Sequence, residues 1–148
     1  MILRSICAAL LAALLVGGGL ACQTGGAGNV PRGSVVIQIN NESINPKQAH
    51  VKAGGSVVWT NFSSYTARVA FPMSIMDELT CKEIRPDFFK TADEIQSIPI
   101  RGGTLDLVLP CPLKPGVYDY TANLFSGQGT VDDMNNPQLR IPGKIVVK

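Results

Sequence analysis

From residue 34 onward, apolar and polar positions alternate over short runs, as they do in half-buried β-strands, and hardly any stretch has helical periodicity. Ten prolines and frequent glycines separate these runs and favour an antiparallel β-sandwich. Only the middle, around residues 77–94, leaves room for an irregular or short-helical insert, in which 91–94 could cap one helical turn. The predicted strands cover residues 35–39, 48–52, 56–61, 66–71, 104–109, 116–122 and 143–148.

The first 21 residues have the layout of a secretory signal peptide. One charge, Arg4, precedes an uncharged run over residues 5–21, and this run ends close to Gly17, Gly18 and Gly19. A membrane-spanning helix needs about 20 predominantly apolar residues. The glycines therefore favour a cleaved leader over a permanent transmembrane helix.

The junction Gly19-Leu20-Ala21-Cys22 resembles the lipobox of bacterial lipoproteins, in which cleavage before the cysteine is coupled to acylation of its sulfur. The resemblance implies palmitate or a similar lipid on Cys22, and Gln23 resembles the signal for sorting to the outer membrane, facing the periplasm. Several acyl chains give stable anchoring. The alternative is ordinary secretion, which would leave Cys22 as a free thiol.

Composition limits the classes of partner and the number of domains. The whole chain has 13 basic and 11 acidic residues, and removal of residues 1–21 takes away only Arg4 and leaves a net charge of +1. Such a balance indicates no nucleic-acid partner. Residues 22–33 are rich in glycine and are predicted to form a flexible tether behind the lipid, and residues 34–148 suffice for one domain.

Two cysteines remain once the others are accounted for. Cys7 leaves with the signal peptide and Cys22 carries the lipid, so Cys81 and Cys111 remain in an oxidising compartment. There, a disulfide between them is the expected state. A metal site built from two thiolates is the alternative, and it suits a reducing compartment better.

Three stretches of the chain resemble the cupredoxin family, the Greek-key sandwiches that include plastocyanin and azurin. Residues 52–61 look like the family's glycine turn followed by its V-x-W-x-N strand. Residues 113–120 look like its P-G-x-Y-x-Y/F strand, and residues 143–147 look like its terminal strand. Their order and spacing extend the resemblance over almost the whole mature domain. The resemblance implies an all-β, cupredoxin-like Greek-key sandwich.

The same resemblance points to four positions where the family places its copper ligands. A blue-copper centre needs two imidazoles and a thiolate, usually with a weak axial thioether. The corresponding residues here are Ala67, Ala122, Phe125 and Ile141, and none of them carries a strong donor atom. The mature chain has a single histidine, His50, on an early predicted strand. We therefore expect a domain with no copper and no other cofactor.

Other chemistries have weaker support. A copper-handling or electron-transfer protein with an unconventional ligand set is the main alternative; that set would come from Met73, Met76, Cys81, Cys111 and His50. Oxygen donors at residues 132–136, together with Met134, read better as turn and packing residues than as a cation site. With one histidine, hydrolytic triads cannot be assembled, so we expect no enzyme activity.

Aromatic residues gather where the copper end of such a sandwich would be. Phe62, Tyr65, Phe71 and Phe125 are predicted to form an apolar patch over Ala67 and Ala122. Exposed apolar patches often mark contact surfaces, so we expect a binding or docking module for an envelope protein partner. Two alternatives are open: the aromatic side chains could fill the space left by the metal, or the domain could be a structural part of a larger envelope complex.

Overall fold

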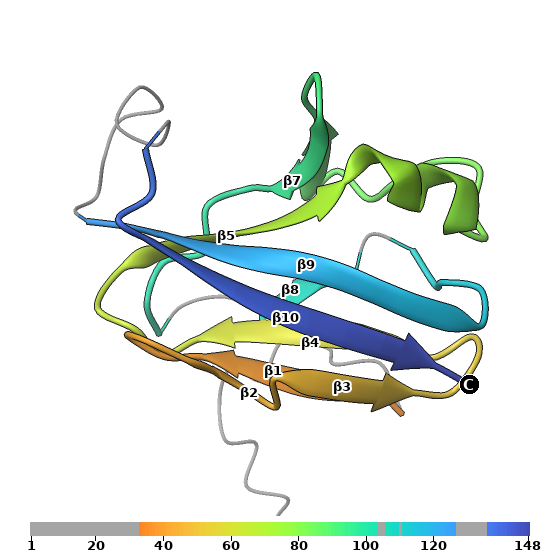
Figure 1. The fold of residues 1–148 in the computed structure, drawn as a ribbon, viewed down its shortest axis with the longest axis horizontal. Coiled ribbons are helices and arrows are strands. Elements are labelled where there is room, and N and C mark those ends of the chain that lie inside the picture. Colours follow the sequence, from red (N-terminus) through yellow and green to blue (C-terminus); the bar gives the residue numbers. More distant parts are fainter. Residues whose placement is uncertain (1–32, 104–105, 110, 127–135) are drawn as a thin grey trace, which may run out of the picture.

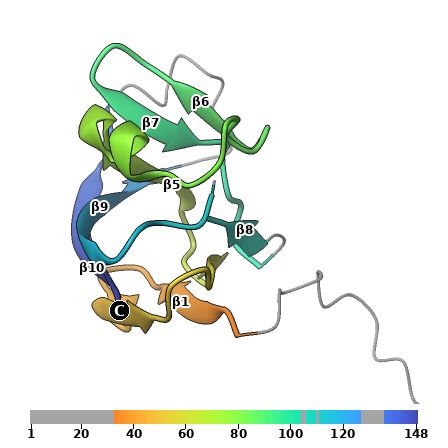
Figure 2. The same cartoon turned by 90° about the vertical axis from the view of Figure 1, so that its right-hand side faces the viewer.

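The computed structural model describes residues 33–103, 106–109, 111–126 and 136–148, and it contains two packed β-sheets (Figures 1 and 2). The four-stranded sheet has the order β2 (Ile44–Asn45), β1 (Val35–Ile39), β4 (Val57–Asn61), β8 (Asp106–Val108). The six-stranded sheet has the order β3 (Gln48–Val51), β10 (Leu139–Val147), β9 (Gly116–Phe125), β5 (Thr66–Pro72), β7 (Glu94–Ser97), β6 (Phe88–Lys90). The all-β sandwich expected from the alternating pattern is confirmed.

Not every strand pair is antiparallel, contrary to the simple expectation from sequence. β1 pairs in parallel with β4, from Val35 opposite Val57 to Ile39 opposite Asn61. β3 likewise pairs in parallel with β10, although these two strands lie far apart along the chain. Because β1 and β4 run the same way, the start of β1 lies at the opposite end of the sandwich from the loop that follows Asn61.

An aromatic cluster joins the two sheets. The ring of Trp59, from β4, lies 5.9 Å from the ring of Phe71 on β5 and 5.4 Å from that of Tyr120 on β9, in each case edge to face. All three side chains are buried. Such edge-to-face pairs contribute about 0.5–1.5 kcal/mol each beyond the apolar area they bury.

The middle segment contains more regular structure than its sequence suggested. A short 3-10 helix, η1 (Met73–Glu78), follows β5 directly, and β6 and β7 then form a hairpin. The helical cap proposed for residues 91–94 is wrong. These residues form the hairpin turn, in which the Thr91 N–H donates to the Glu94 carbonyl and the Glu94 N–H donates to Thr91 Oγ1.

The predicted Cys81–Cys111 disulfide is confirmed. It ties the loop after η1 to the segment before β9 across a sequence separation of 30 residues. On the chain-entropy view, a loop of that length stabilises the fold by roughly 3–4 kcal/mol. In the part of the chain that the structure describes, no helix is long and apolar enough to cross a membrane.

The Tyr120 hydroxyl should make stability depend on pH in the alkaline range. Burial raises its pKa to about 12, and the Trp59 indole N–H, which lies nearby without a well-formed hydrogen bond to it, opposes this rise. In the unfolded chain the hydroxyl ionises near pH 10. The unfolded state therefore releases its proton first, and the free energy of unfolding should fall by roughly 2–3 kcal/mol between about pH 10 and about pH 12.

Denaturant unfolding of wild type and Tyr120→Phe, compared from about pH 8 to about pH 12, measures this contribution. The phenylalanine variant has no hydroxyl at this position, so the free energy of unfolding of wild type, relative to that of the variant, should fall as the pH rises through this window. A difference between the two proteins that stays constant over the whole range would contradict the expectation.

Candidate functional site

The loop between β4 and β5 is held in place by one buried amide side chain. Asn61 Nδ2 donates to the carbonyl oxygens of Tyr65 and Ile100, both at 2.8 Å. Asn61 Oδ1 accepts from the Ser63 N–H at 2.9 Å and from Ser63 Oγ at 2.6 Å. Because Asn61 and Ser63 are buried, these bonds are shielded from water, and they fix the loop to the neighbouring segment at Ile100.

Phe62 stands out from this fixed loop. Its side chain is 60% exposed, whereas the backbone around it is tied on both sides. The Phe62 N–H donates to the Ile39 carbonyl at 2.8 Å, and the Ser64 N–H donates to Asn41 Oδ1 at 2.8 Å. Phe62 is thus a large apolar side chain presented to solvent on a well-anchored backbone.

Tyr65, at the end of the same loop, is half-buried and packs against the core. The other two members of the predicted aromatic patch do not belong to an exposed surface. Phe71 is 0% exposed because it lies in the cluster with Trp59, and Phe125 is only 5% exposed at the end of β9, where it pairs with Thr66. The predicted patch is therefore wrong for Phe71 and Phe125, and its exposed part is Phe62.

The four positions at which the sequence resemblance places copper ligands lie on three adjacent strands. Ala122 on β9 is opposite Val69 of β5 on one side and opposite Ile141 of β10 on the other. Ala67 is opposite Leu124, two pairs further along β5 and β9. The sequence resemblance therefore selected residues that lie close together in the fold.

These four positions carry hydrocarbon side chains. Ala67 and Ala122 are fully buried, and Ile141 and Phe125 are nearly so. None of the four side chains has a nitrogen, oxygen or sulfur atom that could bind copper, so the residues present do not fit a blue-copper ion. Ala67, Ala122 and Ile141 belong to the buried apolar core, whereas Phe125, three residues further along β9 than Ala122, is buried outside that cluster.

The unconventional ligand set is not gathered around one point. Cys81 and Cys111 form a disulfide, which removes both thiolates. Met73 and Met76 lie on η1 and pack against the core. His50 lies on β3, three strand spacings or about 14 Å from β5, and its Nε2 is 3.0 Å from Gln48 Nε2.

Among the residues that the structure describes, no three histidine, cysteine, aspartate or glutamate side chains cluster as a metal site. Residues 132–135, where the sequence offered oxygen donors and Met134, lie outside the described part of the chain, as does Cys22.

Sequence reasoning missed the residues that position the site. The strand motif includes Asn61, but the motif does not indicate the hydrogen bonds that Asn61 donates to Tyr65 in the loop and to Ile100. A buried asparagine at the end of an apolar strand is the available signal, because such a side chain must find hydrogen-bond partners close by.

Comparison with known proteins supports the fold. No protein-family model matches the chain, and no curated protein sequence matches it. Solved structures of amicyanin do match. Amicyanin from Paracoccus versutus (Thiobacillus versutus) is 21% identical, with a TM-score of 0.53, over 81% of this chain and 86% of amicyanin.

Two further structures agree with this result. An oxidised mutant of amicyanin and a mutant described as a reduced Cu(I) form at pH 4 are each 20% identical, with TM-scores of 0.52, over 81% of this chain and 87% of theirs. At this level of identity the likeness concerns the arrangement of the backbone. The chain therefore has the cupredoxin-like Greek-key β-sandwich fold that the three sequence stretches implied.

Proposed function

We propose that this chain is an exported lipoprotein, acylated on Cys22, whose cupredoxin-like domain works without copper and docks onto a protein partner of the bacterial envelope. The observation that carries the docking role is Phe62, 60% exposed on a loop that buried hydrogen bonds hold in place. The leader and the lipobox-like junction at residues 19–22 support the anchor.

The chemistry of the side chains supports the proposal that the domain works without copper. Electron transfer by a blue-copper centre requires a thiolate and two imidazoles around the ion. Ala67, Ala122 and Phe125 occupy those positions here, and Ile141 occupies the axial one. Because all four are buried and apolar, they stabilise this end of the sandwich by packing instead of by coordination.

Phe62 has the properties of an anchor residue in an interface. Interface hot spots are often large side chains that enter a pocket on the partner, surrounded by contacts that exclude water. The polar neighbours Asn41 and Ser64, both exposed, supply such a surround. The fixed backbone lowers the conformational entropy that binding would cost.

Replacement of Cys22 by alanine should prevent acylation of the exported protein, because the sulfur that carries the lipid is lost. The expected result is loss of incorporated labelled palmitate, measured on the protein after immunoprecipitation. Cys7→Ala is the matched control and should be labelled as wild type is. A Cys22→Ala protein that takes up palmitate as wild type does would contradict the lipid anchor.

Metal analysis tests the copper-free assignment. We expect copper far below one ion per chain, and no visible absorption band, when the full chain is exported in copper-supplemented medium and purified without chelator. Stoichiometric copper would overturn the assignment. The variant Met73→Leu with Met76→Leu, together with His50→Ala, would then locate the ligands.

Site-specific cross-linking tests docking through Phe62. A photoactivatable amino acid in place of Phe62, in the exported full chain in cells, should give a discrete cross-linked protein species. The control places the same amino acid at Val36, which is 42% exposed on β1, toward the opposite end of the four-stranded sheet from Phe62. No species at position 62, or the same species in equal yield from both positions, would count against this docking surface.

A further inference from the structure

The first half of β9 has a free edge. β10 pairs with β9 from Gly116 to Leu124, whereas β5 pairs with it only from Thr121 to Phe125. Figure 1 shows the reason: β5 leaves β9 toward its end and continues into η1. Among the described residues, no other segment forms backbone hydrogen bonds with residues 116–120. Alternate residues of this stretch therefore direct unpaired N–H and C=O groups away from β10.

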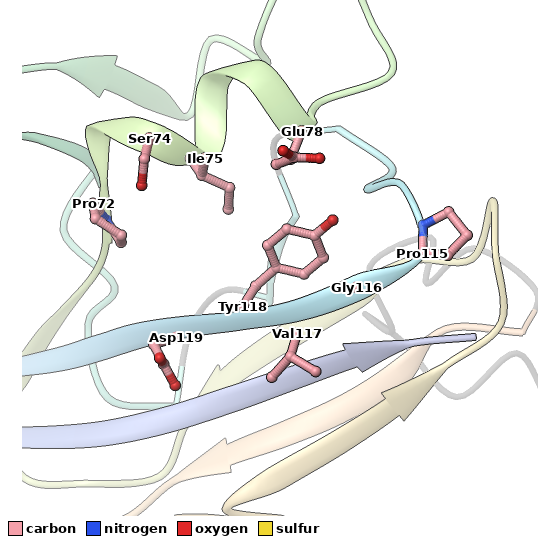
Figure 3. Close-up of a pocket in the computed structure, with 9 residues that line it drawn as sticks. All are labelled: Pro72, Ser74, Ile75, Glu78, Pro115, Gly116, Val117, Tyr118 and Asp119. Atoms are coloured by element: carbon pink, nitrogen blue, oxygen red, sulfur yellow. The ribbon is translucent and has the colours of Figure 1, made fainter.

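A groove runs along this free edge. It has a volume of about 450 Å³, and the end of β5 and η1 form one wall while β9 forms the other (Figure 3). Ser74, Ile75 and Glu78 line it from η1, and Val117, Tyr118 and Asp119 line it from β9. Its position at the end of β5 places it away from the loop that carries Phe62.

The walls of the groove present apolar surface that is already in position. The Val117 side chain is 60% exposed. The Tyr118 hydroxyl donates to the Lys114 carbonyl at 2.9 Å, and its ring lies along Gly116, where a Cβ atom would come within 2.7 Å of the hydroxyl oxygen. The hydrogen bond therefore holds the aromatic wall in this orientation, and a side chain at position 116 would displace the ring.

Glu78 supplies an uncompensated negative charge in this groove. Among the described residues it has no ion-pair partner, since Lys114 Nζ donates instead to the Asp77 carbonyl oxygen at 2.6 Å. Asp119, by contrast, lies 3.5 Å from Lys144 Nζ. Burial raises the pKa of Tyr118, and the Glu78 carboxylate raises it further, which places that charge close to the aromatic wall.

We propose that this groove binds an extended segment of a protein partner, which adds a strand along the Gly116–Tyr120 edge and places a lysine or arginine side chain against Glu78. Addition of a strand to an exposed edge gives affinity through main-chain hydrogen bonds and specificity through alternate side chains. The exposed Val117 side chain offers apolar surface to the added strand, and the Tyr118 ring offers its face to the cation. This surface is separate from Phe62 and does not depend on docking there.

Amide hydrogen exchange with a peptide probe tests the proposal. The probe is a capped seven-residue peptide of alternating valine and threonine with one central lysine, added to the full chain carrying Cys22→Ser. Alternate amides within residues 116–120 should become protected, and those of residues 121–124, which are already paired on both sides, should not change. A peptide with glutamate in place of the lysine should bind more weakly.

Two variants test whether the Glu78 carboxylate is the charge that favours the lysine peptide. Glu78→Gln should weaken binding of the lysine peptide about two- to fivefold, the range of a single exposed ion pair, and should reduce the preference over the glutamate peptide. Glu42→Gln removes the same charge from an exposed position between β1 and β2, away from the groove. This control should change neither the affinity for the lysine peptide nor the preference over the glutamate peptide.

Three results would overturn the proposal. The first is unchanged exchange of the residue 116–120 amides at peptide concentrations that saturate binding. The second is equal binding of the lysine and glutamate peptides. The third is protection of the same amides without peptide that rises with protein concentration, which would assign the edge to a second copy of this chain.

Discussion

Contact of Trp59 with Phe71 and Tyr120 is the interaction on which the rest of the structure depends. It joins the four-stranded sheet to two strands of the six-stranded sheet at the centre of the core. With this contact in place, β5 and β9 pair on one side of it, toward the loop, and separate on the other. Phe71 and Tyr120 thus pack where the pairing of β5 with β9 ends, and the groove lies beyond that point.

The cluster also carries a polar cost. Within the described part of the chain, the indole nitrogen of Trp59 and the hydroxyl of Tyr120 are buried without a hydrogen-bond partner, as is the carboxamide oxygen of Asn123. Each unsatisfied group of this kind costs about 1–3 kcal/mol. The aromatic surface that Trp59 and Tyr120 bury must offset that cost, since edge-to-face geometry fixes where their polar atoms lie. The sandwich therefore depends on apolar packing of this cluster more than on hydrogen bonds within it.

The alternating pattern was sufficient to predict the long strands and the fold class, because period-two alternation is strong wherever one face of a strand is buried. It missed β2, β6 and β7, which have four residues or fewer and give too few positions for a pattern. Parallel pairing of β1 with β4 depends on contacts between distant segments, so no local signal reports it.

The candidate site was predicted in part. Ala67, Ala122 and Ile141 do lie together on neighbouring strands, because a motif preserves register along with residue type. Sequence alone left open whether Phe71 and Phe125 form an exposed patch or fill interior space, since a change of one residue moves a side chain to the opposite face of a strand. The groove could not be predicted either, because it depends on the residue at which β5 stops pairing with β9.

Parallel pairing of β1 with β4 gives the domain a direction. The chain enters β1 from residue 33 at one end of the sandwich, and the Asn61–Tyr65 loop lies at the other. For a domain attached through the residues that precede β1, the loop with Phe62 would be the outermost point, and the free edge of β9 would face back toward the attachment. One partner could then be met at a distance from the anchoring surface and another close to it, and a single tethered domain could bridge the two.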